Sequence, residues 1–245
     1  MLALTPILWS TGCSQTADER RASIYELQAD PTEENRTRIR ALLEDEDRDV
    51  RATALNTLVS LDASDAAQLV LASLDDEDGF VRSMAAKLLG DLGDPGHVEA
   101  LSKRLEGDPD VWVRRRAAEA LTELGGPGAA KGLGRGLQDP MEAVRLASVT
   151  GVRKLDPRAF KAELAAMLLE DPAWEIRVQA ARALALAGDP QFRPVIESSL
   201  TDENEFVRSA AANALKLLDE HEPPPGQAAP GDPDRAPAGA GAAPG

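Results

Sequence analysis

The chain has 245 residues, of which 27 are lysine or arginine and 42 are aspartate or glutamate, so its formal net charge at pH 7 is −15. So acidic a surface repels phosphate backbones, and we expect no nucleic-acid partner. One cysteine and two histidines exclude a disulfide framework, a four-ligand zinc site and an iron–sulfur cluster, so we expect no metal and no cofactor. Aromatic residues make up 3% of the chain, which favours a core of alanine, leucine and valine in closely packed helices.

The N-terminal segment is uncharged over residues 1–12 and ends at Cys13, after which the chain becomes polar. It is too short to span a bilayer, which takes about 20 apolar residues. Thr11-Gly12-Cys13 resembles the last three places of a bacterial lipoprotein signal peptide, although Ser10 departs from the usual aliphatic residue. The basic region that normally begins such a peptide is also missing, so an upstream start stays open. Residues 13–17 are expected to be a short linker.

This resemblance implies that acyl chains are attached to Cys13 and that the protein lies in the bacterial cell envelope. Ser14 after the cysteine resembles the signal that sorts lipoproteins to the outer membrane, facing the periplasm. The membrane would then be contacted only through the lipid anchor. The alternative is a cytoplasmic protein in which the Cys13 thiol has no special role.

A valine–arginine or isoleucine–arginine pair recurs six times along the middle of the chain, with the arginines 31, 32, 31, 32 and 31 residues apart. An aspartate stands six residues before each arginine. The six pairs are Asp45 and Arg51, Asp76 and Arg82, Asp108 and Arg114, Asp139 and Arg145, Asp171 and Arg177, and Asp202 and Arg208. Positions −1, +3, +4, +7 and +10 from the arginine are apolar almost throughout, which predicts an amphipathic helix after each aspartate.

The boundaries of these helices are also marked in the sequence. Each aspartate is predicted to be the N-cap, because proline or glutamate often follows it. Stop signals follow the apolar stripe, as at Gly93-Asp94-Pro95 and Gly188-Asp189-Pro190. A shorter apolar pattern, for example Val98, Leu101 and Leu105, predicts a second helix before the next aspartate. Each repeat is therefore a helix hairpin of about 31 residues.

A single hairpin of this size cannot bury its own apolar faces, so neighbouring hairpins must stack. We therefore expect residues 18–221 to form an all-α fold, a right-handed α-solenoid of about six hairpin repeats. Residues 18–30, with Ile24 and Leu27 on one face, are predicted to be a degenerate helix that caps its N-terminal end. Residues 222–245 are rich in proline, glycine and alanine and are expected to be a disordered spacer. The alternative for this tail is a docking peptide for a proline-binding module.

The recurring aspartate, arginine, alanine and leucine over residues 45–218 resemble HEAT repeats, in the short variety named for phycobilisome lyases. This resemblance implies that aspartates and arginines of successive repeats form a hydrogen-bonded ladder. Six residues apart, two side chains lie on different faces of one helix. Arg82 is therefore expected to reach the aspartate of an adjacent repeat rather than its own.

The sequence shows no pattern of catalytic residues. The acidic runs around Asp45 and Asp76 fail the calcium-loop pattern, because Leu74 and Ala85 would take the first and twelfth ligand places. His97 is expected to be an exposed side chain at the start of a helix. We therefore expect a protein that is not an enzyme, a monomer that acts as an interaction scaffold for another protein. The alternatives are a lyase-like enzyme or chromophore-handling protein, and a cytosolic regulatory scaffold.

The partner surface is expected where large side chains gather at the entry to the arginine-bearing helices. Trp112 and Trp174 are candidate anchors, since tryptophan and arginine dominate interface hot spots. The alternative is that these rings wedge between repeats. Outward positions +1, +5 and +9 add the candidates Arg115, Lys154 and Arg182. With Glu119 and Glu123 at the same offsets, they give the central repeats mixed charge.

Overall fold

The computed structural model describes residues 15–221. The predicted signal peptide over 1–12, lipid attachment at Cys13 and the predicted disordered tail over 222–245 all lie outside these residues. Within them, the chain forms thirteen α-helices joined by short 3₁₀ segments and turns, with no β-strand. The predicted all-α class, a repeat solenoid of helix hairpins, is confirmed. Contacts divide the chain into a first unit that ends at Glu163 and a second that begins at Leu164, and each is described by itself.

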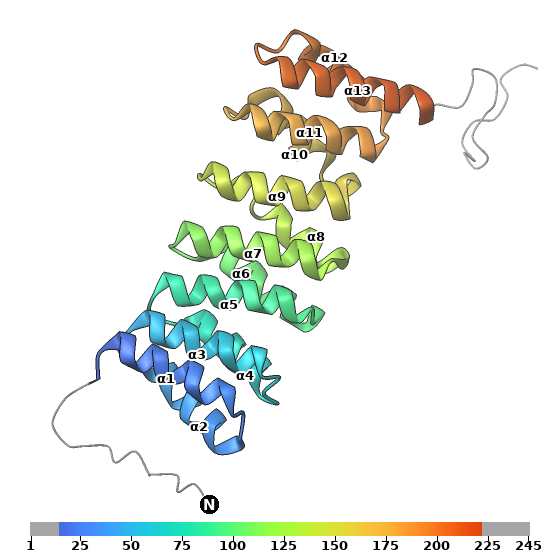
Figure 1. The fold of residues 1–245 in the computed structure, drawn as a ribbon. Helices are drawn as coiled ribbons and strands as arrows, with labels where there is room; N and C mark the ends of the chain where they lie inside the picture. The colour runs from blue at the N-terminus through green and yellow to red at the C-terminus, as the bar shows by residue number, and fades with distance from the viewer. Residues whose placement is uncertain (1–14, 222–245) are drawn as a thin grey trace, which may run out of the picture. The chain divides into compact units, whose positions relative to one another are not determined.

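In the first unit, helices of two layers alternate along the chain. Each odd-numbered helix packs on the next odd-numbered helix (Figure 1). Its α-helices are α1 (Ala17–Ala29), α2 (Glu33–Ala41), α3 (Arg48–Ser60), α4 (Ala66–Ala72), α5 (Gly79–Leu92), α6 (Val98–Gly107), α7 (Val111–Leu124), α8 (Gly126–Gly134) and α9 (Glu142–Leu155). Helices α1, α3, α5, α7 and α9 form one layer, and α6 and α8 pack together in the other. Four hairpins therefore follow the single helix α1.

The second unit contains two further hairpins. It comprises most of α10 (Lys161–Glu170), and α11 (Trp174–Ala187), α12 (Arg193–Ser198) and α13 (Glu205–His221). Helix α13 packs on both α11 and α12, as the stacking of neighbouring repeats requires. The described hairpins number six, which agrees with the six sequence repeats.

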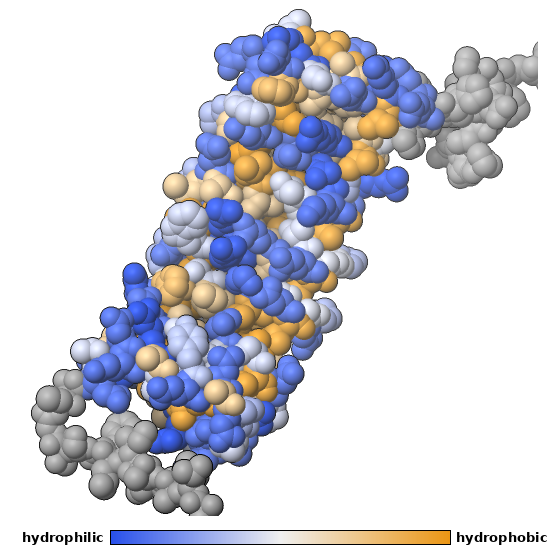
Figure 2. All heavy atoms as spheres, viewed as in Figure 1, coloured by the Kyte–Doolittle hydropathy of each residue, from blue (hydrophilic) through white to orange (hydrophobic). Residues whose placement is uncertain are grey.

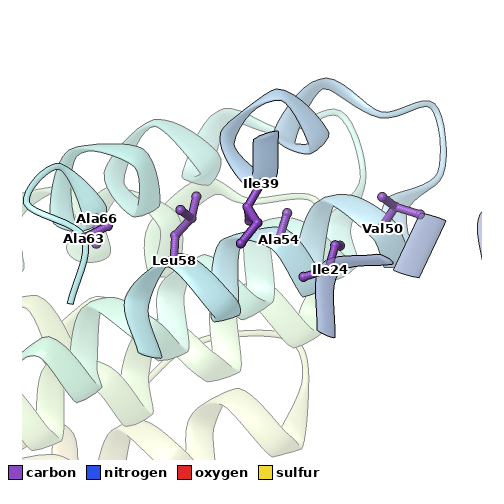
Figure 3. Packing of buried hydrophobic residues seen from close by; sticks show 7 residues of the cluster. All are labelled: Ile24, Ile39, Val50, Ala54, Leu58, Ala63 and Ala66. Atoms are coloured by element: carbon purple, nitrogen blue, oxygen red, sulfur yellow. The ribbon is translucent and has the colours of Figure 1, made fainter. Parts of the chain in front are cut away.

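The core is built from small and branched aliphatic side chains, as the scarcity of aromatic residues predicts. At the N-terminal end, Ile24 of α1, Ile39 of α2 and Leu58 of α3 are fully buried against one another with their neighbours (Figure 3). Leu89 and Leu121 continue this pattern along α5 and α7. Alanines between the leucines, such as Ala117, let the two helix layers approach closely.

The starts of the arginine-bearing helices differ from the prediction by two residues. Asp47, Asp78 and Asp110 are the N-caps of α3, α5 and α7, and not the predicted aspartates. The predicted aspartate instead forms a turn before the helix, in which Asp108 Oδ1 accepts the N–H of Asp110 at 2.9 Å. The Asp108 carboxylate also accepts hydrogen bonds from Arg82 of the preceding repeat. Asp108 therefore lies in the turn before the helix and not at the N-cap.

The hairpin repeat predicts a helix at the places of α2 and α8, although no apolar pattern was identified for these two helices individually. Helix α8 has four glycines in nine residues, so few of its side chains can form an apolar stripe. Each glycine also weakens a helix by about 0.5–1 kcal/mol relative to alanine. Its environment explains the glycines, because a methyl group added at Gly132 would meet Ser102 and Leu121 of two neighbouring helices. The predicted glycine stops do occur, since Gly93 and Gly188 end α5 and α11 with φ of 71° and 67°.

Gly151 on α9 provides a test of this close packing. A methyl group there would lie 2.6 Å from Leu133 Cδ1 and would also meet Thr122. We expect Gly151→Ala to lower the free energy of unfolding by about 1–3 kcal/mol through overpacking. Gly107→Ala is the control, because a methyl group there meets nothing within 4 Å. Urea unfolding monitored by circular dichroism measures both, and equal or greater stability of Gly151→Ala would contradict the packing shown.

Candidate protein-binding surface

The arginine-bearing helices are joined to their neighbours by a buried two-pronged contact. Arg82 of α5 donates from Nε to Asp108 Oδ2 at 2.9 Å and from Nη2 to Asp108 Oδ1 at 2.8 Å. Its third nitrogen, Nη1, donates to the backbone carbonyl of Asp76 at 2.9 Å. Asp108 is only 3% exposed. Arg82 therefore binds the carboxylate of the following repeat and only the backbone of the aspartate in its own.

The same geometry recurs in both units. The further carboxylate pairs are Arg51 with Asp76 and Arg114 with Asp139 in the first unit, and Arg177 with Asp202 in the second. Arg145, Arg177 and Arg208 donate from Nη1 to the carbonyls of Asp139, Asp171 and Asp202. The structure thus brings together arginines and aspartates of successive repeats.

Two further arginine–aspartate contacts were missed in the sequence. The first extends the ladder to α1, and the second joins α2 to the start of α4. Arg20 of α1 contacts Asp45 at 2.7 Å, and Arg40 of α2 contacts Asp65 at 2.8 Å. Arg20 lies 31 residues before Arg51, so extending the repeat period backwards would have found it. It was missed because Glu19, and not valine or isoleucine, precedes it. No comparable periodic signal marks Arg40.

The ladder lowers the pKa of its aspartates. Burial alone would raise the pKa of Asp108, but hydrogen bonds from Arg82 and from the Asp110 N–H, with the positive charges of Arg82 and Arg104, hold it below its usual value. Asp45, Asp76 and Asp202 respond in the same way. For Asp65 the hydrogen bond from Arg40 is the largest influence, and its pKa is also lowered. These aspartates are therefore charged in the folded protein.

The ladder leaves the outer face of the same helices open. On α7 and α9 of the first unit, an open groove of about 730 Å³ is lined by Arg115, Glu119, Met141, Leu146 and Lys154, among others. Met141 is 46% exposed at its edge. Figure 2 shows hydrophobic side chains interleaved with hydrophilic ones on the face where these two helices come forward in Figure 1. We call this feature the α7–α9 groove.

Trp112 stands beside the groove. Its side chain is 59% exposed, and the Arg115 guanidinium lies 5.6 Å from the centre of its ring. Arg115 Nε also donates to Glu119 at 2.8 Å, so the arginine is held between the ring and a carboxylate. Trp112 is therefore mostly exposed and not buried between repeats. It is available as an anchor next to a positioned charge.

The second unit carries the other two predicted residues. Trp174 is 37% exposed and stacks on Phe206, with ring centroids 5.1 Å apart. Arg182 is exposed on α11. These residues belong to a surface of the second unit, whereas Trp112, Arg115 and Lys154 belong to the first. Phe206 itself is an exposed neighbour that the candidate set omitted.

The described residues show few of the side-chain arrangements that catalytic sites use. Over residues 15–221, no group of three or more histidine, cysteine or acidic side chains is arranged to hold a metal ion. His97 is buried, contrary to expectation, because it lies in the 3₁₀ turn Pro95–His97 beneath the start of α6. In the same part of the chain, none of the helices has the length and apolar character needed to cross a membrane.

Comparison with known proteins identifies the repeat. A model of HEAT repeats matches residues 13–86, 72–153 and 162–227. An uncharacterized phycocyanin operon protein Z from Pseudanabaena tenuis is 30% identical over 185 residues, covering 74% of this chain and 79% of that protein.

Two solved structures are also similar. The HEAT-like repeats protein from Thermococcus onnurineus is 14% identical with a TM-score of 0.53, covering 86% of this chain and 99% of that one. The complex of CpcE and CpcF of phycocyanin lyase from Nostoc is 21% identical with a TM-score of 0.45, covering 90% and 100%. At these identities the first likeness concerns the fold alone, and the second supports no structural argument.

The comparisons correct one expectation. The prediction that this protein is not an enzyme is contradicted, because a phycocyanin operon protein is 30% identical to it over 185 residues. The sequence reasoning failed here because a HEAT repeat specifies a fold and not a reaction. The absence of a familiar nucleophile or metal pattern was therefore weak evidence about activity.

Removing one carboxylate tests the ladder. We expect Asp108→Asn to lower the free energy of unfolding by about 3 kcal/mol, because it leaves the buried Arg82 without a compensating charge. Glu77→Gln is the control, since that side chain is 88% exposed and should change stability by less than about 0.5 kcal/mol. Urea unfolding of both variants checks this, and equal midpoints would show that the contact is not needed.

Acid provides a second test of the same contacts. Because folding lowers the pKa of these aspartates, their stabilisation is complete above the unfolded value of about 3.9 and is lost as the pH falls through the lower folded value. We expect the melting temperature to fall steeply below about pH 4, and less steeply in Asp108→Asn. Thermal unfolding between neutral and strongly acidic pH measures this. A melting temperature unaffected by acid would contradict the lowered pKa values.

Proposed function

This chain belongs to the HEAT-repeat family, and from that premise we propose that it binds a second protein through the α7–α9 groove and that this binding serves a lyase-type enzyme. HEAT-repeat proteins commonly mediate protein interactions. The observation that carries the proposal is Trp112, a mostly exposed ring held against Arg115 at the edge of an open groove.

The chemistry of the groove indicates what kind of surface it fits. Arg115 and Lys154 supply positive charge, Glu119 and other glutamates supply negative charge, and Met141 and Leu146 supply apolar area. Such a lining favours a folded protein surface of mixed character over a phosphate backbone, which would need a basic groove. Because Arg115 is already held by Glu119, binding costs little side-chain entropy.

The relationship to a phycocyanin operon protein suggests the class of partner. We infer that the second protein is a phycobiliprotein subunit and that the chain presents it for attachment or removal of its chromophore. This role is carried by the 30% identity over three quarters of the chain. A purified chain that binds such a subunit but never changes its bilin content, alone or with a second lyase-type subunit, would contradict the enzymatic part and leave the binding part standing.

We further infer that the protein is held at a bacterial envelope membrane by acyl chains on Cys13, and that it faces the periplasm from the outer membrane. The support is the sequence Thr11-Gly12-Cys13 followed by an abrupt change to polar residues. In the cytoplasmic alternative, the protein lies in another compartment and the Cys13 thiol carries no acyl chain. Cell fractionation with lipid labelling therefore separates the two possibilities.

Substitution in the groove tests the binding proposal. With a bilin-free phycocyanin subunit as the probe, we expect Trp112→Ala to weaken binding at least about tenfold, since hot-spot residues contribute about 2 kcal/mol or more. Arg115→Glu should act in the same direction. Arg158→Glu is the matched control, because it makes the same charge change at an exposed position outside the groove. Equal affinity of Trp112→Ala and wild type in biolayer interferometry would exclude the groove as the binding surface.

Fractionation of bacterial cells tests the location. We expect wild type to be found with membranes and to incorporate a labelled fatty acid, and Cys13→Ala to be unlabelled and absent from the membrane fraction. Ser14→Ala should keep its label, because the residue after the cysteine affects only sorting. A soluble, unlabelled wild type would refute the lipid anchor.

A further inference from the structure

A second open pocket of the first unit lies where α3, α5 and α7 begin. Its volume is about 480 Å³, and it shares no lining residue with the α7–α9 groove. Its lining includes Phe80 of α5 and Trp112 of α7, which are 43% and 59% exposed. Asp110, the N-cap of α7, also lines it. We call this feature the α5–α7 pocket. It combines two exposed aromatic side chains with a carboxylate.

This carboxylate has no opposite charge paired with it. Asp110 Oδ1 accepts the N–H of Trp112 at 2.7 Å, as an N-cap does. Within residues 15–221, no lysine, arginine or histidine forms an ion pair with Asp110. The two arginines of the lining already have carboxylate partners. Arg48 Nη1 lies 3.6 Å from Asp78, and Arg116 donates to Glu119 at 2.8 Å. The pocket therefore offers one carboxylate to a positively charged ligand.

The place of this carboxylate depends on Gly79, the first residue of α5. A methyl group added at Gly79 would lie 2.3 Å from Asp110 Oδ2, so the oxygen rests where a side chain would otherwise stand. In the other five repeats, the position three residues before the ladder arginine holds a residue with a side chain. These residues are Arg48, Val111, Glu142, Trp174 and Glu205. Only the repeat of α5 has a glycine here, which makes room for the carboxylate of the next repeat.

The aromatic side chains indicate which positive group fits. The Arg48 guanidinium lies 5.5 Å from the centre of the Phe80 ring, and that of Arg115 lies 5.6 Å from the centre of the Trp112 ring. Each of these guanidiniums also has a carboxylate partner. A guanidinium beside both a ring and a carboxylate is therefore a combination that this surface uses twice. The α5–α7 pocket provides two rings and the Asp110 carboxylate for a third.

We propose that the α5–α7 pocket binds an arginine side chain of a basic partner protein, with the guanidinium beside Phe80 and Trp112 and paired with Asp110. Charge complementarity near the pocket supports a basic partner. Glu46 and Glu77, in the turns before α3 and α5, are each 88% exposed. Such carboxylates attract a positively charged surface and repel an acidic one. The proposal does not rest on binding in the α7–α9 groove, because the two surfaces have separate linings.

A short peptide with one arginine between glycines tests the proposal in the full chain. Binding is followed by the NMR signal of the Trp112 indole N–H. We expect this signal to move during titration with the arginine peptide. It should stay in place with the same peptide carrying citrulline, a neutral analogue of arginine. Equal movement with the two peptides would overturn the proposal. No phycocyanin subunit is involved, so this result is independent of binding in the α7–α9 groove.

Variants separate the pocket from general attraction to an acidic chain. Asp110→Asn removes the charge and keeps an N-cap acceptor, and Gly79→Ala displaces the carboxylate. We expect each to weaken binding of the arginine peptide at least about threefold. Asp94→Asn is the control, because it makes the same charge change at an exposed N-cap outside the pocket and should leave the affinity unchanged. Wild-type affinity in a folded Asp110→Asn variant would exclude the pocket as the arginine site.

Discussion

The arrangement of each unit depends on one interaction, the two-pronged contact between an arginine and the aspartate of the next repeat. The Arg82 guanidinium is fixed on one side by carbonyls of its own turn and on the other by Asp108. Asp108 in turn accepts the N–H of Asp110 and so shapes the start of α7. Buried ion pairs contribute less net stability than their geometry suggests, because desolvation opposes them. Their clearer effect is to fix the register in which one hairpin stacks on the next.

This contact also decides which residues are available for binding. The ladder occupies the start of each arginine-bearing helix, and the apolar stripe occupies its inner face, so only the outward positions are free of structural demands. Arg115, Glu119 and Lys154 lie there. Part of the net charge of −15 also has a structural origin, since Asp47, Asp78 and Asp110 are N-caps, whereas an arginine balances the charge of each ladder aspartate. Acidity here reflects how the repeat is constructed more than what it binds.

The sequence was sufficient to predict the repeat and its hairpins. It was insufficient to predict features that depend on contacts with neighbouring repeats. Period and apolar offsets predicted the hairpins because each repeat has the same local constraints. The N-cap assignment failed at Asp108 because nothing in one repeat shows that its carboxylate faces another. The apolar pattern of α8 was not identified, because Gly132 is required by Ser102, which belongs to another helix. Trp112 and Arg115 were named as candidates, but their contact and exposure depend on tertiary structure.

An enzymatic role is compatible with a fold that places no metal cluster among its described residues. When the substrate is itself a protein, orientation of the two reacting groups can supply much of the rate, because it removes translational and rotational entropy from the reacting step. A unit of stacked hairpins with a groove of about 730 Å³ and a positioned Trp112–Arg115 pair is suited to that task. The chemical groups can then come from the bound protein or from a second subunit. The HEAT repeat specifies the fold and not a reaction, so the side chains at the outward positions, and not the repeat itself, would have to account for an enzymatic role.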